Sequence, residues 1–249
     1  MLKITIKQKI AVIELNNEVT NAIGPKLVSE LRAKLLEMGS DEEIRAIILT
    51  SANTKFFSIG LNIPELYEYT REKFTQFYTA FNELCIELYL FPKPTIAIIN
   101  GHAIAGGCIL ALCCDYRFIS QERKLMGLNE IKLGVPVPYP ALQILENMIG
   151  SEHTKDFVYN GEFHPPESLL EIGIIDEIIP PDELFEYSLD KCQSLAKNPS
   201  LTFAKIKLDL KMPVVDQIKT GLDSHIRSFV DSWYSHDTRV LLKEAMGKF

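Results

Sequence analysis

Segments with a strand-like hydrophobic pattern alternate with segments of helical pattern through the first half of the chain, and this alternation restricts the fold most. Residues 10–15 and 44–50 are apolar runs rich in β-branched side chains, and residues 25–38 between them carry apolar side chains at helical spacing. A helical stretch at 72–91 and a strand-like run at 95–100 repeat this order. Strands alternating with helices predict an α/β fold in which helices pack on a sheet.

Beyond residue 138 the strand-like runs become rare and helical patterns dominate. They cover residues 141–149, 154–160, 166–172, 181–195, 200–212 and 214–248. A chain of 249 residues without repeats or a Gly/Ser linker is expected to form one main domain. We expect a core over residues 1–190 and a helical C-terminal region over residues 191–249.

The charge and the cysteines exclude several classes of function. A formal net charge of −7 argues against nucleic acid or an anionic membrane as a partner. The five cysteines form no disulfide framework and no CxxC or HxxxH spacing, so we expect buried thiols in a reducing compartment and no metal site. The alternating N-terminus lacks the order of a secretory signal, and no apolar run approaches the ~20 residues of a membrane span. A soluble, cytoplasmic protein is expected.

The motif FFSIGLN, residues 56–62, follows the strand-like run that ends near Thr50. Glycine accepts backbone conformations that other residues avoid, so Gly60 permits a sharp turn that leaves the amide of Leu61 free. An ordinary turn after a strand is the simpler interpretation of this motif alone.

The motif INGHAIAGGCILALCCDYRF, residues 99–118, joins a strand end to a run of small and apolar residues. Gly106 opens that run, and free amides at the start of such a helix suit a developing oxyanion. Glycines that merely allow close packing are the alternative. His102 lies in the same segment, but no serine, cysteine or aspartate accompanies it in a nucleophile motif, so we interpret it as structural.

The motif MGLNEIKLGVPVP, residues 126–138, places Glu130 among the apolar Leu128, Ile131 and Leu133. A carboxylate in a dry pocket holds its proton more tightly, which suits a base that takes and returns a proton near neutral pH. For any single glutamate a solvated position is the default, so its context decides.

The order and spacing of these three motifs resemble the crotonase (enoyl-CoA hydratase/isomerase) family. The resemblance extends to NAIGPKLVSEL near residue 21 and to PPESLLEIGIIDEIIPPDEL near residue 165, and so covers nearly the whole chain. It implies a crotonase-like ββα spiral core with a helical C-terminal trimerisation region. It also implies an acyl-CoA substrate, no cofactor besides the coenzyme A of that substrate, and a homotrimer or hexamer.

The resemblance also implies the site residues. The amides of Leu61 and Gly106 would bind the thioester carbonyl as an oxyanion hole, and Glu130 would be the catalytic acid/base. The remaining residues that it implies for the substrate and its coenzyme A are Asn21, Ala22, Ile23, Ser58, Ile59, Gly60, Asn62 and Ile63.

One substitution favours a particular reaction within the family. Hydratases of this family use two glutamates, and the first of those positions is Ile109 here, which cannot orient or deprotonate water. Glu130 alone suffices to remove a proton from C2 of a 3-enoyl-CoA and to return it at C4. The segments AGGCILALCCDYR and GLNEIKLGV resemble most the mitochondrial-type Δ3,Δ2-enoyl-CoA isomerases.

Three departures from the family pattern leave alternatives open. Ile59 replaces a small residue and would narrow the adenine entrance, Asn62 replaces an acidic residue and would keep a loop-fixing hydrogen bond, and prolines at 136, 138 and 140 would stiffen the wall beside Glu130. The alternatives are another crotonase reaction, such as hydration, thioester hydrolysis or dehalogenation, and a non-catalytic member that binds acyl-CoA.

Overall fold

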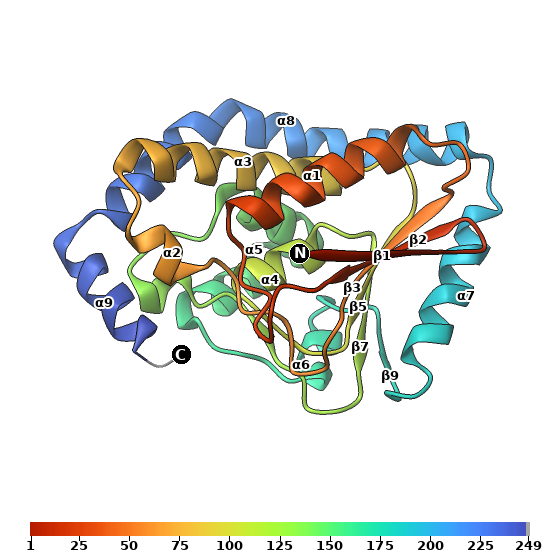
Figure 1. The fold of residues 1–249 in the computed structure, drawn as a ribbon, viewed down its shortest axis with the longest axis horizontal. Coiled ribbons are helices and arrows are strands. Elements are labelled where there is room, and N and C mark those ends of the chain that lie inside the picture. The colour runs from red at the N-terminus through yellow and green to blue at the C-terminus, as the bar shows by residue number, and fades with distance from the viewer. Residues whose placement is uncertain (248–249) are drawn as a thin grey trace.

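A six-stranded sheet forms the centre of the molecule in the computed structural model, which describes residues 1–247 (Figure 1). Its strand order is β1-β2-β3-β5-β7-β9, in which β1 and β2 are antiparallel and the following neighbours are parallel. The strands are β1 (Leu2–Lys7), β2 (Ile10–Leu15), β3 (Ala46–Ser51), β5 (Thr95–Ile99), β7 (Tyr116–Ser120) and β9 (Glu177–Ile179). The α/β class predicted from the alternating pattern is confirmed.

The central strands β2, β3 and β5 are buried on both faces, which explains why they are nearly continuous apolar runs, whereas the edge strand β1 is largely exposed. Along β2, Ile10 and Val12 pack into a cluster with Leu184 and Cys192 of α7 (Leu184–Ala196). The alternate side chains, such as Ile13, face the main core. The main core also contains the buried faces of α1 (Pro25–Ser40), α3 (Arg71–Tyr89) and α4 (Gly106–Leu112).

A smaller parallel sheet carries the two glycine-containing motifs. It consists of β4 (Phe56–Ser58), β6 (His102–Ile104) and β8 (Met126–Gly127) in that order. These strands have two or three residues, too short for a hydrophobic period, so the sequence pattern did not predict them. Because parallel strands end at one edge, the segments that follow β4, β6 and β8 are brought together there.

The C-terminal half is helical, as predicted, and two of its helices differ from the expected segments. The remaining helical elements are α2 (Ile63–Tyr67), η1 (Glu130–Leu133), α5 (Tyr139–Asn160), α6 (Pro166–Glu171), α8 (Ser200–Trp233) and α9 (His236–Met246). Gly150 interrupts α5 with a φ of 74°, where the sequence pattern also breaks. In contrast, α8 continues through Pro213, so residues 200–233 form one helix in place of a segment that ends at residue 212.

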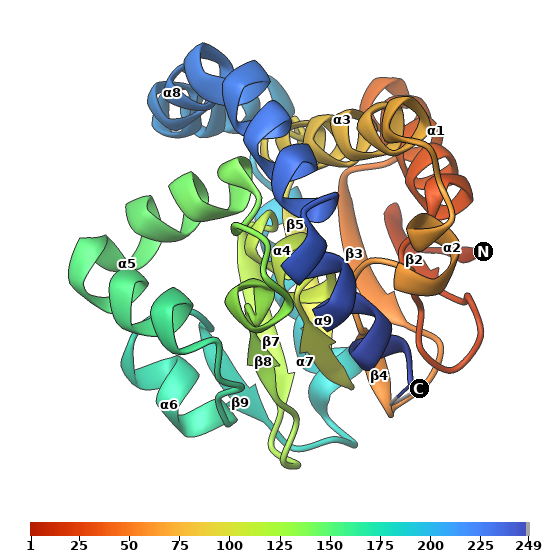
Figure 2. The same cartoon turned by 90° about the vertical axis from the view of Figure 1, so that its left-hand side faces the viewer.

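Helix α8 lies beside α3, with α1 on the other side of α3, and α9 turns back across the smaller sheet (Figures 1 and 2). A buried charge cluster fastens α8 to the core. The carboxylate of Asp115 accepts hydrogen bonds from Lys207 at 2.7 Å and Lys211 at 2.6 Å. The boundary expected after residue 190 falls inside α7, and the division into two regions stays a prediction.

Two sequence expectations concern cysteines and membranes. Each of the five cysteines is buried and free, as predicted. Among residues 1–247, none of the helices has the length and apolar character to cross a membrane.

Candidate active site

The turn after β4 is built around Gly60. Its φ of +92° is a conformation that side chains other than glycine strain to adopt. The carbonyl of Gly60 accepts the amide of Ile23 at 2.8 Å, and the amide of Asn62 donates to the carbonyl of Ile23 at 2.9 Å. These two hydrogen bonds join the loop of Ile23 to the residues on either side of Leu61, and neither uses the Leu61 amide.

The turn after β6 leads directly into α4. Ala105 precedes the helix with a φ of 45°, and Gly106 is its first residue. A side chain on Gly107 does not fit, because its Cβ atom would lie 2.3 Å from the carbonyl oxygen of Ser58, and a Cβ atom on Gly106 would be crowded at 3.0 Å from Cδ1 of Ile23. The two glycines therefore allow α4 to begin in contact with the loop that contains Gly60.

The amides of Leu61 and Gly106 are available to a ligand. Neither donates to a protein acceptor within residues 1–247. The Gly106 amide belongs to the first turn of a helix, where amides lack a partner within the helix and carry partial positive charge. Two such donors can bind one oxygen atom on which negative charge develops.

Glu130 begins the one-turn 3₁₀ helix η1, which follows β8. Gly134 closes this turn in the left-handed conformation, with a φ of 76°, and the amide of Val135 donates to the carbonyl of Glu130 at 3.1 Å. The Glu130 side chain is 5% exposed, and its Oε2 atom has no hydrogen-bond partner among the described residues. Its carboxylate is therefore free to accept a proton from a ligand.

Burial raises the pKa of Glu130 from its ordinary value of 4.5 to about 7, although its own backbone amide lowers it slightly. Burial disfavours the charged form of an acid, and a base whose pKa lies near the working pH both takes and returns a proton readily. The expected dry surroundings of Glu130 are confirmed.

A cavity of about 570 Å³ contains all three predicted catalytic groups in its wall. Leu61 and Gly106 contribute to it from the two glycine turns, and Glu130 from η1. Ile109, one helical turn after Gly106, also lines it, at the position where the family resemblance implies a second glutamate in hydratases. Of the residues predicted to bind the substrate, Ile59 and Ile63 line this cavity.

Two other residues predicted to bind the substrate hold the loops in place. The amide group of Asn21 donates to Ser51 Oγ at 2.8 Å and to the Phe57 carbonyl at 3.1 Å. The hydroxyl of Ser58 donates to the Asn21 carbonyl at 2.8 Å and accepts the Gly60 amide at 3.1 Å. Both side chains are 0% exposed, so their contacts are with protein, and direct binding by them stays a prediction.

The remaining four predicted residues also lie in or beside these loops. Ala22 is half-buried, Ile23 and Gly60 are buried against Gly106, and the side-chain amide of Asn62 donates to Glu65 at 2.9 Å. The hydrogen-bonding role expected of Asn62 is therefore present. None of the four lines the cavity, and their binding role stays a prediction.

The cavity wall includes residues that the motifs did not indicate. Phe229 and Trp233 come from the end of α8, and Leu241, Glu244 and Ala245 from α9, with Phe81 of α3 beside them. Two aromatic residues four positions apart on a helix match an ordinary core face, so their sequence spacing carried no functional signal. Tertiary folding alone brings these helices over Glu130.

His102 also lines the cavity, although we interpreted it as structural. Its Nδ1 atom accepts the amide of Leu125 at 3.0 Å, which assigns the proton of the neutral ring to Nε2. Burial and then the positive charges of Lys124 and Lys55 lower the pKa of His102 below 6.5. The ring is therefore neutral at pH 7 and supports the β6–β8 connection, in agreement with a structural role.

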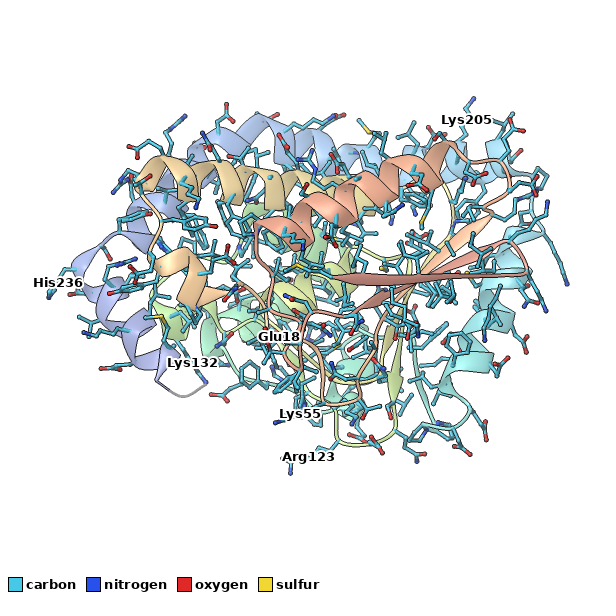
Figure 3. The ribbon with its side chains drawn as sticks, viewed as in Figure 1. Glu18, Lys55, Arg123, Lys132, Lys205 and His236 are labelled. Carbon is cyan, nitrogen blue, oxygen red and sulfur yellow. The ribbon has the colours of Figure 1, made fainter. Side chains whose placement is uncertain are left out.

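The charged side chains near this end of the molecule point mostly into solvent (Figure 3). Lys55 and Arg123 project from loops at one edge, and Lys132 lies near α9, where it pairs with Glu162 at 2.6 Å. Within residues 1–247, no three His, Cys, Asp or Glu side chains gather as a metal site would require.

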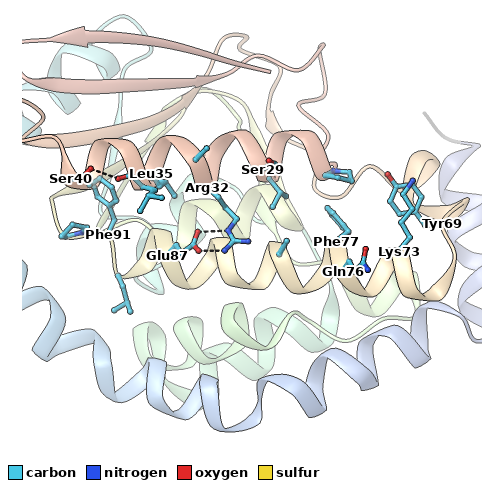
Figure 4. Close-up of a pocket in the computed structure, with 18 residues that line it drawn as sticks. Ser29, Arg32, Leu35, Ser40, Tyr69, Lys73, Gln76, Phe77, Glu87 and Phe91 are labelled. Atoms are coloured by element: carbon cyan, nitrogen blue, oxygen red, sulfur yellow. Dashed lines mark hydrogen bonds and ion pairs between the residues drawn. The ribbon is translucent and has the colours of Figure 1, made fainter.

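A larger cavity of about 940 Å³ lies between α1 and α3 (Figure 4). Its wall is largely apolar, and its most prominent polar group is Arg32, whose Nε donates to Glu87 at 2.9 Å. None of the predicted catalytic or binding residues lines it. The larger cavity is therefore not the candidate site. The site is identified by the free amides and the buried carboxylate that share the wall of the smaller cavity.

Known proteins resemble this chain along nearly its whole length. The sequence profile of the family described as enoyl-CoA hydratase/isomerase matches residues 5–249. The mouse protein "Enoyl-CoA delta isomerase 1, mitochondrial" is 33% identical over 230 residues, which cover 92% of this chain and 79% of that protein. A "Short-chain-enoyl-CoA hydratase" of Clostridium acetobutylicum is 27% identical, covering 97% of this chain and 91% of that protein.

A solved structure, human mitochondrial delta3-delta2-enoyl-CoA isomerase, superposes with a TM-score of 0.95. It is 26% identical, and the match covers 99% of this chain and 97% of that chain. The fold predicted from the resemblance, a spiral core with a helical C-terminal region, is confirmed by this likeness.

Proposed function

Because the chain belongs to the enoyl-CoA hydratase/isomerase family, we propose that it converts a 3-enoyl-CoA to a 2-trans-enoyl-CoA with Glu130 as its single acid/base. This proposal is based on the contents of one cavity wall. The wall contains the buried carboxylate of Glu130, whose Oε2 atom has no hydrogen-bond partner among the described residues, and the aliphatic Ile109. Coenzyme A belongs to the substrate, so the reaction needs no cofactor. The isomerases among its relatives support the same choice.

The proposed reaction moves one proton. Ionised Glu130 removes a proton from C2, and the electron pair of that C–H bond delocalises onto the thioester oxygen. The amides of Leu61 and Gly106 stabilise this oxyanion, a contribution that typically changes the rate ~100- to 1000-fold per donor. Protonated Glu130 then returns the proton to C4, the double bond lies between C2 and C3, and the carboxylate is restored.

The apolar wall supports this step in two ways. Ile109, Leu133 and Val135 exclude water from the dienolate, so it is not quenched by a solvent proton. A pKa near 7 leaves Glu130 partly ionised in the resting enzyme and makes the protonated form a competent donor.

Hydration of a 2-enoyl-CoA is the second candidate, and Glu244 is the observation that favours it. Among the described residues of the cavity wall, Glu244 is the only carboxylate besides Glu130. Hydration needs a second group to orient water. Glu244 is exposed to solvent, whereas Glu130 is buried, and we therefore rank hydration second.

One assay distinguishes the candidates. The protein is mixed with a 3-enoyl-CoA and, separately, with a 2-enoyl-CoA, and the conjugated and hydroxylated products are measured. The isomerase predicts conjugation that Glu130→Gln abolishes and Glu244→Gln preserves. Hydration that both variants abolish would establish the hydratase instead, and tight coenzyme A binding without either reaction would indicate a non-catalytic member.

We also propose that the protein assembles as a homotrimer or a pair of trimers. Large apolar side chains lie exposed on α8 and α1, namely Leu201 at 88%, Leu210 at 71% and Leu36 at 78%. Exposed apolar side chains mark subunit contacts where they gather in a patch, and Ile206 and Leu208 add to those of α8. Sedimentation equilibrium tests this: a species of 28.2 kDa at micromolar concentration would contradict it.

A further inference from the structure

Thr238, in the first turn of α9, contacts the turn that begins with Glu130. Its side chain is 2% exposed, and its hydroxyl donates to the carbonyl of Gly134 at 2.8 Å. The approach is close, since a Cβ atom on Gly134 would lie 2.7 Å from Thr238 Oγ1. The amide of Thr238 donates to Ser235 Oγ at 3.3 Å, which caps the start of the helix.

Gly134 connects this contact to the carboxylate. It ends η1 in the left-handed conformation, and its amide donates to the carbonyl of Ile131 at 3.2 Å. The next amide, that of Val135, donates to the carbonyl of Glu130. A shift of Gly134 therefore changes the backbone that orients Glu130.

The same helix closes the cavity over Glu130. Leu241 and Ala245 line the cavity one and two turns after Thr238, and Leu242 is buried beneath them. At its outer side, Arg239 donates to the carbonyl of Tyr67 at 2.9 Å, which fastens α9 to α2. Figure 2 shows α9 between α5 on one side and α2 on the other.

We propose that Thr238 is a positioning residue for Glu130, which holds η1 in its catalytic orientation and holds α9 closed over the carboxylate. The expected effect of Thr238 on the rate of catalysis rests on the proposed function. Its consequence for the ionisation of Glu130 does not, because burial of that carboxylate exists without substrate.

The ionisable groups that face Glu130 come from several elements. Tyr78 on α3 and Cys108 on α4 lie close enough to interact with its charge, and His102 on β6, Lys132 on η1 and Glu244 on α9 line the same cavity. Substitution of Thr238 changes none of these groups directly. A change in the titration of Glu130 would therefore report its position or its exposure to water.

The experiment compares Thr238→Val, which keeps the side-chain shape, with Thr238→Ser, which keeps the hydroxyl. Carboxyl ¹³C NMR follows the titration of Glu130 in the full chain without substrate, with the resonance assigned by its absence from Glu130→Gln. In Thr238→Val we expect the pKa to fall by about one unit, toward 4.5. We expect kcat to fall roughly 10- to 100-fold while KM changes by less than about threefold. In Thr238→Ser, the pKa of Glu130 and kcat should match those of the wild type.

Ser235→Ala is the matched control, because it weakens the start of α9 without touching Gly134. All measurements are made below the melting temperature of each variant. If Ser235→Ala lowers the pKa as much as Thr238→Val does, or if folded Thr238→Val titrates and turns over like the wild type, the positioning role is overturned. Should Thr238→Val not fold, Thr238→Ala gives the same comparison against Ser.

The two proposals fail in different ways. A wild type that isomerises no 3-enoyl-CoA, yet whose Glu130 titrates lower in Thr238→Val, contradicts the proposed function and supports the role of Thr238. An active wild type whose titration is unchanged in Thr238→Val contradicts only the role of Thr238.

Discussion

Gly60 and Gly106 touch each other across the cavity wall: a Cβ atom on Gly106 would lie 3.1 Å from Cα of Gly60, and one on Gly60 would lie 2.9 Å from the Gly106 amide nitrogen. The two free amides, of Leu61 and Gly106, belong to segments that are distant in sequence. Their separation is therefore set by the absence of side chains at these two positions.

Gly60→Ala should reduce kcat by about 100-fold or more, because the new methyl group displaces the Gly106 amide from the oxyanion position. Steady-state kinetics with a 3-enoyl-CoA measures this. Gly173→Ala is the control: its φ of +80° imposes similar backbone strain, but apart from its two chain neighbours no residue comes within 4 Å of its Cβ. Equal losses in the two variants would mean that strain, and not the contact, is responsible.

The rate of isomerisation should rise with pH through about 7 and then level off, since only ionised Glu130 removes the C2 proton. The pH dependence of kcat/KM measures this for the free enzyme. An acid limb near the ordinary carboxyl value of 4.5 would show that Glu130 is not the base or is not dry.

Glu130→Gln should stabilise the folded chain at pH 8. The folded state holds the Glu130 proton more tightly than the unfolded state, so stability from this group is present below pH 4.5 and is lost as the pH rises to about 7. Removing the ionisable group avoids this loss, which amounts to up to about 3 kcal/mol. Urea unfolding at pH 5 and pH 8 measures the difference between the proteins, which should be larger at pH 8. A difference independent of pH would contradict the raised pKa.

Ile109→Glu should create measurable hydration of a 2-enoyl-CoA, because it adds a second carboxylate one turn from the oxyanion amide of Gly106. Isomerisation should slow, since two neighbouring carboxyl groups oppose each other's ionisation. Formation of 3-hydroxyacyl-CoA is the readout. Ile109→Gln, polar but not basic, is the control, and hydration that is equal in both variants would contradict the idea.

Asp115→Asn should destabilise the chain by roughly 3–5 kcal/mol, because it leaves Lys207 and Lys211 largely buried without their counterion. Thermal unfolding measures the loss. Lys207→Met in the same chain should recover part of it, since it removes one of the unpaired charges. An unchanged stability in Asp115→Asn would show that the cluster does not fasten α8.

The centre of the large sheet could be predicted from the sequence because β2, β3 and β5 are buried on both faces and are therefore apolar along most of their length. The strands β4, β6 and β8 could not, because two or three residues carry no period. The helical assignment of residues 200–212 was correct, but its end was wrong: Pro213 costs α8 a hydrogen bond, and packing of Val214 and Val215 against the core outweighs that cost.

Glu130, Leu61 and Gly106 could be proposed because the order and spacing of their motifs resemble those of the enoyl-CoA hydratase/isomerase family. Each motif alone also allowed a simpler interpretation. The contribution of Trp233 and α9 could not be proposed, since a residue that faces a cavity and one that faces a core have the same sequence pattern. His102 lines the cavity, but its Nδ1 atom accepts a hydrogen bond from the Leu125 amide, so its position in the wall does not imply a catalytic role.

Because α9 completes the wall over Glu130, the active site can form only after residues 236–246 have been synthesised. A ribosome-bound chain that has released η1 but still retains residues 236–246 would hold Glu130 in water, with the proton affinity of an ordinary glutamate. Catalytic competence would then arise only when α9 docks, which makes activity a reporter of that docking.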